Sequence, residues 1–181
     1  MAKVLVPLAD GCEEIEAVTI IDLLRRAGIE VVTAGLKTGI VTASRGVQLV
    51  PDVVLDVAVQ DDYDMVVLPG GMPGAAHLKA DLRLIELLKK MEAAGKYTAA
   101  ICAAPMVLAE AGVLDGKRAT SYPGFLDALP GVMVSAEAVV QDGKVLTSRG
   151  PGTAMDFALT LVEVLTGSDK RRQVEAALVR P

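Results

Sequence analysis

The chemistry of this chain centres on Cys102, which ends a short apolar run and is followed by small residues and a proline. The run Tyr97–Ile101 has the composition of a buried strand, and Pro105 is tolerated in the first turn of a helix but not inside one. The sequence therefore predicts a sharp strand-to-helix turn at the cysteine, as a nucleophile elbow requires. A thiol at the start of a helix is favoured as a thiolate. The alternative is a buried structural cysteine, because free cysteines are among the most buried residues.

A second group of reactive side chains lies in the acidic segment Asp10–Glu16, at the predicted start of the first helix. Carboxylates there complement the helix dipole, which accounts for Glu13 or Glu14 without any catalytic role. Glu16 differs, since it precedes the core-facing Ala17 and is expected to point inward. Burial would raise the pKa of Glu16, so that it could donate a hydrogen bond to a thiolate or shuttle a proton.

A glycine pair, Gly70 and Gly71, follows the third predicted strand. One interpretation is a turn that needs positive φ, which glycine adopts at no steric cost. The other is functional: a backbone N–H of this pair and that of Ala103 would form an oxyanion hole. His77, the one histidine, is interpreted as a surface or hydrogen-bonded side chain in preference to a catalytic one. Cys12 is interpreted as a packing residue in preference to a second nucleophile.

Strand-like and helix-like segments alternate along most of the chain, and these elements must position the reactive residues. The predicted strands are 3–8, 30–34, 65–68 and 97–101, with two or three more within 132–148. One predicted helix ends near residue 28, and two others span about 81–94 and 152–165. Residues 38–55 are predicted to form a hairpin excursion. This order predicts one α/β domain over residues 1–181, a three-layer sandwich with a mostly parallel central sheet. Ligands bind at the carboxyl ends of such strands, so the loops carrying Glu16, Gly71 and Cys102 should meet there.

Composition limits the classes of partner. The 181 residues include 18 Lys plus Arg against 23 Asp plus Glu, which gives a formal net charge of −5 and a pI near 4.9. There is no basic stripe and aromatic residues make up 3 %, so nucleic acid is not an expected partner. Hydrophobic residues reach 52 %, but no apolar run approaches the ~20 residues of a membrane span, so no membrane contact is expected. Because no signal-peptide pattern is present at the N-terminus, a cytoplasmic location is expected.

Two cysteines and one histidine leave little scope for a metal or a disulfide. Cys12 and Cys102 lie far apart in a chain expected to be intracellular, which argues against a structural disulfide. The chain has no CxxC or HExxH pattern, so no metal site is expected. No motif requires an organic cofactor, and none is expected.

Five motifs in sequence order resemble those of the ThiJ/PfpI superfamily, and more closely its branch of small parkinsonism-associated glyoxalase/deglycase-like proteins. The resemblance runs from residue 4 to about residue 179 and is carried by residues 9–16, 23–29, 63–71, 99–105 and 147–153, which read ADGCEEIE, LLRRAGI, YDMVVLPGG, AAICAAP and TSRGPGT. The resemblance implies a flavodoxin-like sandwich, usually a homodimer, with Cys102 as the elbow nucleophile and Glu16 as its carboxylate partner. It also implies that the Gly71 and Ala103 amides line the oxyanion site.

One position departs from the pattern of this superfamily. Members with an additional catalytic histidine place it directly after the cysteine or after a later strand, whereas this chain has Ala103 and Tyr122 at those positions. A Cys–His dyad is therefore not expected, which argues against the protease or amidase activity of one branch. A tyrosine, with an ordinary pKa near 10, cannot replace imidazole as a base at neutral pH. Tyr122 could still orient a substrate oxygen.

The sequence thus favours a cofactor-independent glyoxalase that converts methylglyoxal or glyoxal to lactate or glycolate. Cys102 would add to the aldehyde and Glu16 would move the proton, which suits a small reactive carbonyl better than a peptide. A deglycase activity would use the same residues. The alternative is a redox-responsive protective protein or chaperone with little turnover, in which Cys102 oxidises readily and a protonated Glu16 holds the sulfinate.

Three arginines are candidates for anion binding or for an interface: Arg26, Arg45 and Arg149. Arg26 follows Arg25, and a solvated surface charge explains it equally well. Arg45 lies in the excursion that relatives bring to a dimer interface, where it would help to close the site.

Overall fold

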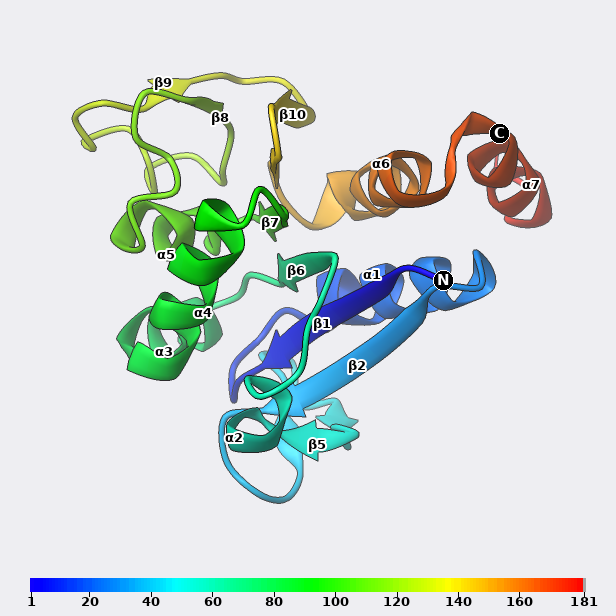
Figure 1. Ribbon diagram of the computed structural model, residues 1–181, viewed down its shortest axis with the longest axis horizontal. Coiled ribbons are helices and arrows are strands. Elements are labelled where there is room, and N and C mark those ends of the chain that lie inside the picture. Colours follow the sequence, from blue (N-terminus) through cyan, green and yellow to red (C-terminus); the bar gives the residue numbers. More distant parts are fainter. Residues whose placement is uncertain (181) are drawn as a thin grey trace.

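The predicted apolar runs pair into one seven-stranded sheet in the computed structural model, which describes residues 1–180 (Figure 1). The strand order is β10-β11-β7-β6-β1-β2-β5, and neighbouring strands are parallel except β10 with β11. The strands are β1 (Lys3–Leu8), β2 (Glu30–Gly35), β5 (Val53–Val54), β6 (Met65–Leu68), β7 (Tyr97–Ile101), β10 (Val139–Asp142) and β11 (Val145–Ser148). The neighbours β1, β6 and β7 therefore end at one edge, where α/β sheets bind ligands.

Helices cover both faces of the sheet, which confirms the three-layer α/β sandwich expected from the sequence. The first face carries α1 (Glu14–Arg26), α6 (Ala154–Thr166), with one 3₁₀ turn (Pro151–Thr153) before it, and α7 (Ser168–Ala177). The second carries α2 (Leu55–Ala58), α3 (Gly74–Ala80), α4 (Leu82–Ala93) and α5 (Pro105–Glu110). Among the described residues, no helix combines the length and apolar character needed to cross a membrane.

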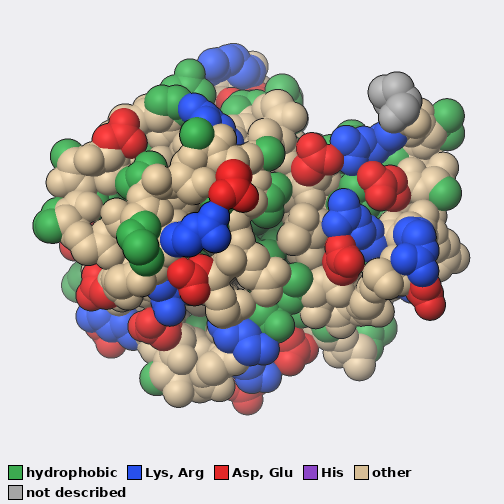
Figure 2. Space-filling view, turned by 90° about the horizontal axis from the view of Figure 1, so that it is seen from above, with side chains coloured by type: hydrophobic (Ala, Val, Ile, Leu, Met, Phe, Trp, Pro, Cys, Tyr) green, Lys and Arg blue, Asp and Glu red, His purple; other side chains and the backbone are tan. Residues whose placement is uncertain are grey.

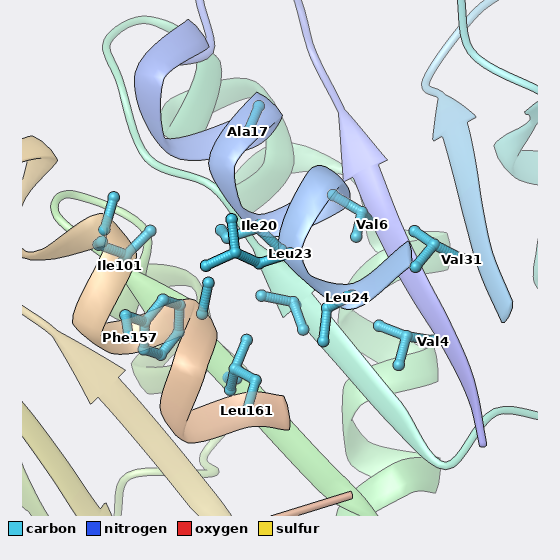
Figure 3. Packing of buried hydrophobic residues seen from close by; sticks show 14 of the residues in the cluster. Val4, Val6, Ala17, Ile20, Leu23, Leu24, Val31, Ile101, Phe157 and Leu161 are labelled. Atoms are coloured by element: carbon cyan, nitrogen blue, oxygen red, sulfur yellow. The ribbon is translucent and has the colours of Figure 1, made fainter. Parts of the chain in front are cut away.

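Two hydrophobic clusters fill the space between the sheet and its helices. In β1, Val4 and Val6 belong to the cluster under α1 and α6, whereas Leu5 belongs to the cluster under α3 and α4. Both faces of the strand are thus covered, which explains why the sequence of β1 is apolar throughout. Figure 3 shows Ile20 of α1 and Phe157 of α6 in the first cluster, and both are fully buried. This packing holds the start of α1, where the acidic segment lies, against the sheet.

The sequence pattern does not indicate every element. The mostly polar α7 buries Val174 alone, so its hydrophobic periodicity is weak, and α2 and α3 are too short for a periodic pattern to show. The predicted hairpin within 38–55 is present as β3 (Val41–Thr42) and β4 (Gln48–Leu49), but β5 leaves it and extends the main sheet beside β2. Two further short strands, β8 (Arg118–Ala119) and β9 (Met133–Val134), pair with each other outside the main sheet.

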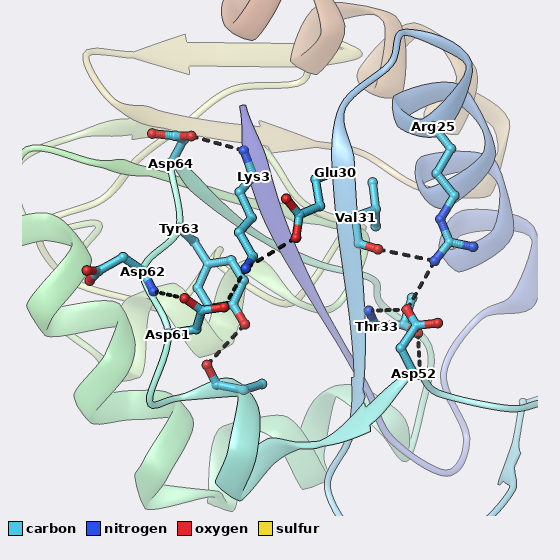
Figure 4. A network of polar contacts seen from close by, with 11 residues as sticks. Lys3, Arg25, Glu30, Val31, Thr33, Asp52, Asp61, Asp62, Tyr63 and Asp64 are labelled. Carbon is cyan, nitrogen blue, oxygen red and sulfur yellow. Dashed lines mark hydrogen bonds and ion pairs between the residues drawn. The ribbon is translucent and has the colours of Figure 1, made fainter. Parts of the chain in front are cut away.

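Polar contacts hold β1 and β2 to the loops around them (Figure 4). The Lys3 side chain pairs with Glu30 at 3.2 Å, and the Lys3 backbone N–H donates to Asp64 at 2.9 Å. On the face of the sheet that α1 covers, Arg25 of α1 pairs with Asp52 at 3.0 Å. Exposed ion pairs contribute little stability individually. Figure 2 shows Lys and Arg side chains lying among Asp and Glu side chains on one face of the molecule.

Candidate active site

Cys102 occupies the sharp turn between β7 and α5 that its sequence context predicts. Its φ is 64°, in the left-handed region that side chains other than glycine rarely adopt. Pro105 stands at the first helical position of α5, as expected. The Cys102 N–H donates to the Ser148 carbonyl at 3.0 Å, and the Cys102 carbonyl accepts from the Tyr122 N–H at 2.8 Å. These main-chain bonds hold the strained turn, and Cys102 is nearly buried, with 9 % of the residue exposed.

Glu16 points inward from the first turn of α1, as the sequence predicts, and is fully buried. Its Oε2 accepts a hydrogen bond from the Gly70 N–H at 2.8 Å, whereas its Oε1 has no hydrogen-bond partner among the described residues. Burial raises the pKa of Glu16 to about 7, although the Gly70 N–H and the Cys102 thiol lower it. A carboxyl group that titrates near neutral pH, with one oxygen free, can both accept and donate a proton.

The two glycines after β6 are required by close packing. A Cβ on Gly70 would lie 2.7 Å from the Cys102 Cβ and 2.8 Å from Glu16 Oε2, so the Gly70 backbone lies directly between the two reactive groups. A Cβ on Gly71 would lie 2.3 Å from the Glu13 backbone nitrogen, and the φ of Gly71 is +90°. Any side chain at either position would push the loop away from Cys102 and Glu16.

Opposing influences act on the pKa of the Cys102 thiol. Burial, followed by the nearby negative charge of Glu16, raises the pKa of Cys102 to about 12, while the N–H groups of Gly71 and Ala103 lower it. Burial outweighs the two amides and the short helix, so the resting sulfur is a neutral thiol. This corrects the expectation of a resting thiolate, and it leaves Glu16 as the nearby group that can take the thiol proton.

Three residues that the sequence predicts to bind the substrate or its oxyanion differ from this expectation in position or in contacts. The Gly70 N–H is occupied by Glu16, so Gly70 positions the carboxylate and does not itself point at a reacting oxygen. The Tyr122 backbone contacts Cys102, but its ring is 50 % exposed. Arg45 is exposed, and its guanidinium donates to the Ser44 carbonyl at 3.4 Å, so within one copy of the chain it belongs to the hairpin and not to the site.

His77 and Cys12 fit their structural interpretations. The exposed His77 lies on α3 with Nδ1 3.0 Å from the Asp10 carbonyl oxygen. Cys12 is fully buried, and burial, together with the charge of Glu14, raises its pKa to about 11. Cys12 has no exposed surface through which a reactant could reach its sulfur, so it is a packing residue and not a second nucleophile.

The side chains of the other two candidate arginines bind groups other than Cys102 and Glu16. Arg26 forms an exposed ion pair with Asp22 at 2.6 Å along α1, which fits a solvated surface charge. Arg149 donates through Nη1 to the Ala136 carbonyl at 2.8 Å. No group of three or more His, Cys, Asp or Glu side chains within residues 1–180 is arranged to hold a metal ion.

Sequence reasoning missed two supporting residues. Ser148 is fully buried at the end of β11, where its carbonyl holds the Cys102 N–H. Gly74 packs so closely on the acidic loop that a Cβ would lie 2.5 Å from the Cys12 nitrogen. The TSRGPGT motif contains Ser148 and could have drawn attention to it. That Ser148 lies next to Cys102 becomes clear only from the strand order, which places β11 beside β7.

Comparison with known proteins gives close relatives over nearly the whole chain. "Protein DJ-1 homolog B" of Arabidopsis thaliana is 45 % identical over 180 residues, which is 98 % of this chain but 41 % of that relative, so the chain spans less than half of it. "Glutathione-independent glyoxalase DJR-1.2" of Caenorhabditis elegans is 38 % identical over 171 residues, covering 93 % of this chain and 90 % of that protein.

A solved structure and a family profile agree with these relatives. The structure titled "Toxoplasma gondii DJ-1, oxidized" superposes with a TM-score of 0.95 at 45 % identity, covering 99 % of this chain and 98 % of the other. The flavodoxin-like fold expected from the resemblance is thereby confirmed. The profile of the DJ-1/PfpI family matches residues 2–164, and on this evidence the chain belongs to the DJ-1/PfpI family.

Proposed function

We propose that this protein is a cofactor-independent glyoxalase that converts methylglyoxal to lactate and glyoxal to glycolate. The observation that carries the proposal is the free Oε1 of the buried Glu16, a carboxyl group titrating near pH 7 beside the one partly exposed thiol. A relative that is 38 % identical is named a glutathione-independent glyoxalase, which supports the same chemistry.

The first step joins the sulfur to the aldehyde. Glu16 takes the thiol proton as the Cys102 sulfur bonds to C1 of methylglyoxal, and the proton then passes to the C1 oxygen to give a hemithioacetal. The small opening at Cys102 admits an aldehyde group more readily than a peptide. Because the thiol is neutral at rest, a base must act during the attack, and the free oxygen of Glu16 is placed for that role.

The second step moves hydrogen from C1 to C2. Glu16, again a carboxylate, removes the C1 proton to form an enediolate and returns it to C2, while a proton passes from the C1 oxygen to the C2 oxygen. The product is a thioester of lactate on Cys102. Water then attacks C1, the sulfur–carbon bond breaks, lactate leaves and the sulfur regains its proton. The net reaction adds one water to methylglyoxal, and no redox cofactor is needed.

Main-chain donors would stabilise the negative charge that forms on oxygen in these steps. The N–H groups of Gly71 and Ala103 already act on the Cys102 sulfur, so a substrate oxygen bound to C1 would lie within their reach. Preorganised donors of this kind are worth about 10²–10³ in rate. The Tyr122 hydroxyl is left to orient the second oxygen. A deglycase activity on early glycation adducts would use the same residues.

A homodimer, the expected partner state, is part of the proposal. Ile15 and Val18 on α1 and Val50 after the hairpin are 56 %, 45 % and 79 % exposed, and α1 and the hairpin border a hollow of about 330 Å³. A second copy of the chain would cover these apolar side chains. Arg45, which projects from the same hairpin, would then be carried toward the partner's site.

The second candidate is a redox-responsive protein with little turnover. It is favoured by the solved relative from Toxoplasma gondii, whose title describes it as oxidized. A protonated Glu16 could donate a hydrogen bond to a Cys102 sulfinate. The raised pKa of Cys102 weighs against this candidate, since the thiolate is the form that oxidises.

The purified protein should form lactate from methylglyoxal, and Cys102→Ala should lose this activity, because no other thiol reaches the surface. Lactate is measured with a lactate dehydrogenase assay. The matched control is Cys12→Ala, which removes the fully buried thiol and should retain the activity. Equal lactate from the wild type and Cys102→Ala would end the glyoxalase proposal.

Glu16→Gln should have opposite effects on two measurements. Removing the negative charge should lower the pH midpoint of Cys102 alkylation by about one unit, since that charge raises the thiol pKa. The rate of lactate formation should fall by about 10²–10⁴, since the proton carrier is lost. Iodoacetamide labelling is followed by peptide mass, with exposed Glu86→Gln as control. A midpoint that rises, or a retained rate, would contradict these roles.

Mild peroxide should oxidise Cys102 faster than Cys12, because Cys12 is fully buried and Cys102 is not. Mass spectrometry of the two cysteine peptides over time measures both rates. If Cys12 oxidises as fast as Cys102, the redox candidate loses its basis. Abundant sulfinate on Cys102 without lactate formation would favour this candidate over the glyoxalase.

The protein should sediment as a dimer at micromolar concentration, and Val50→Asp should shift it toward the monomer. An aspartate there would place a charge in the apolar surface that the second copy covers. Leu82→Asp is the matched control, because Leu82 is 77 % exposed on α4, on the other face of the sheet, and should leave the mass unchanged. A wild type that sediments as a monomer would contradict both the proposed dimer and the proposed role of Arg45 at the partner's site.

A further inference from the structure

We infer that Tyr122 and Phe125 form an aromatic wall beside Cys102 that selects α-oxoaldehydes bearing an aryl group over those bearing a methyl group. This inference rests on the proposed function, since it names the substrate class of the same site. Both residues belong to one four-residue turn. The two rings would contact the substituent of the substrate and not the carbon that bonds to sulfur, so the role inferred here is selection and not catalysis.

The local sequence brings the two rings together. In the turn Tyr122–Phe125, the second residue is proline and the third is Gly124 with φ +96°, the arrangement typical of a type II turn. The Phe125 N–H donates to the Tyr122 carbonyl at 3.3 Å, which closes the turn. The ring centroids lie 6.4 Å apart with planes at 76°, an edge-to-face pair. The fully buried Leu126 anchors the turn to the core.

The same turn is attached to the nucleophile. The Tyr122 N–H donates to the Cys102 carbonyl at 2.8 Å. On the other side, the Tyr122 ring lies 3.5 Å from the position that a Cβ on Gly150 would take, and Gly150 is two residues after Ser148, which holds the Cys102 N–H. The first contact fixes the Tyr122 backbone on the Cys102 turn, and the second places the Tyr122 ring against Gly150, just after the strand that adjoins β7.

The exposure of this ring is unusual for the chain. Only five aromatic residues are present, and two of them stand in this one turn. Phe157 is fully buried and Tyr63 is 3 % exposed, whereas Tyr122 is 50 % exposed. A half-exposed ring beside a reactive thiol has an apolar face available to a ligand.

The size of the opening decides which part of the substrate meets the wall. Because only 9 % of Cys102 is exposed, we expect the aldehyde carbon to reach the sulfur while the substituent on the ketone carbon stays outside. A methyl group there gains little from the Tyr122 face. An aryl group can pack on it edge-to-face or offset, which is worth about two- to tenfold in binding. Phenylglyoxal is the simplest substrate of this class.

The first test compares kcat/KM for phenylglyoxal with kcat/KM for methylglyoxal. Tyr122→Ala should lower this ratio about two- to tenfold, while Tyr122→Phe should preserve it because the ring remains. The control is Tyr97→Leu, since Tyr97 lies at the opposite end of β7, covered by the Lys144 ammonium at 3.9 Å from the ring centroid. Methylglyoxal turnover with a ratio that Tyr122→Ala does not change would overturn the inference.

A second test does not need turnover, and it separates failure of the inference from failure of the proposed function. Cys102 is alkylated with 2-bromoacetophenone or bromoacetone; each forms a sulfur–carbon bond and releases bromide. The rate ratio of aryl to methyl reagent, relative to that of a free thiol, should exceed one in the wild type and fall in Tyr122→Ala only. If neither oxoaldehyde is turned over but this ratio depends on Tyr122, the glyoxalase proposal fails and the aryl-selective wall stands. An identical aryl-to-methyl rate ratio in the wild type and in Tyr122→Ala would overturn the inference of an aromatic wall.

Discussion

The hydrogen bond from the Gly70 N–H to Glu16 Oε2 is the contact on which the geometry of the site depends. It joins α1 to the loop after β6 across 54 residues of sequence. The approach is so close that a methyl group on Gly70 would meet both Cys102 and Glu16 within 2.8 Å. The missing side chain permits the contact, and the N–H partly satisfies a carboxylate that would otherwise be buried without a partner. Neither the inward turn of Glu16 nor its distance from the sulfur could persist without this glycine.

The same burial sets the proton balance of the site and its cost in stability. Burial raises the pKa of Glu16 from 4.5 to about 7, a difference of roughly 3 kcal/mol between its two protonation states. The stability that protonated Glu16 contributes is fully present below pH 4.5 and is lost as the pH rises through about 7. Above that pH the folded protein holds a poorly solvated carboxylate next to a neutral thiol. Glu16 thus contributes least to the stability of the native state at the pH where it becomes a carboxylate, as expected of the proton-transfer role that we propose for it.

Much of this arrangement could be read from the sequence, because it rests on short-range patterns. The apolar runs of β1, β6 and β7 and the periodic faces of α1, α4 and α6 predict the parallel sandwich, and parallel strands bring their following loops to one edge. The inward direction of Glu16 followed from its place beside Ala17. The protonation state of Cys102 could not be predicted, since it depends on how burial balances two amides and one carboxylate. The use of the Gly70 N–H by Glu16 likewise depends on the distance between two loops, which no local pattern encodes.

The strain at Cys102 explains why the residues around it must act together. A non-glycine residue with φ of 64° costs about 1–3 kcal/mol, which the surroundings must offset. One restraint comes from β11, whose Ser148 is in register with Ile101 and is fixed by the sheet. The other comes from the Tyr122 N–H, which donates a hydrogen bond to the Cys102 carbonyl. The segment that holds the strained turn is therefore also the segment that presents the aromatic ring, so a change in its conformation alters both the exposure of the sulfur and the surface that a substituent meets. In the function that we propose, reactivity and selection are thus linked through one main-chain hydrogen bond, not through separate parts of the fold.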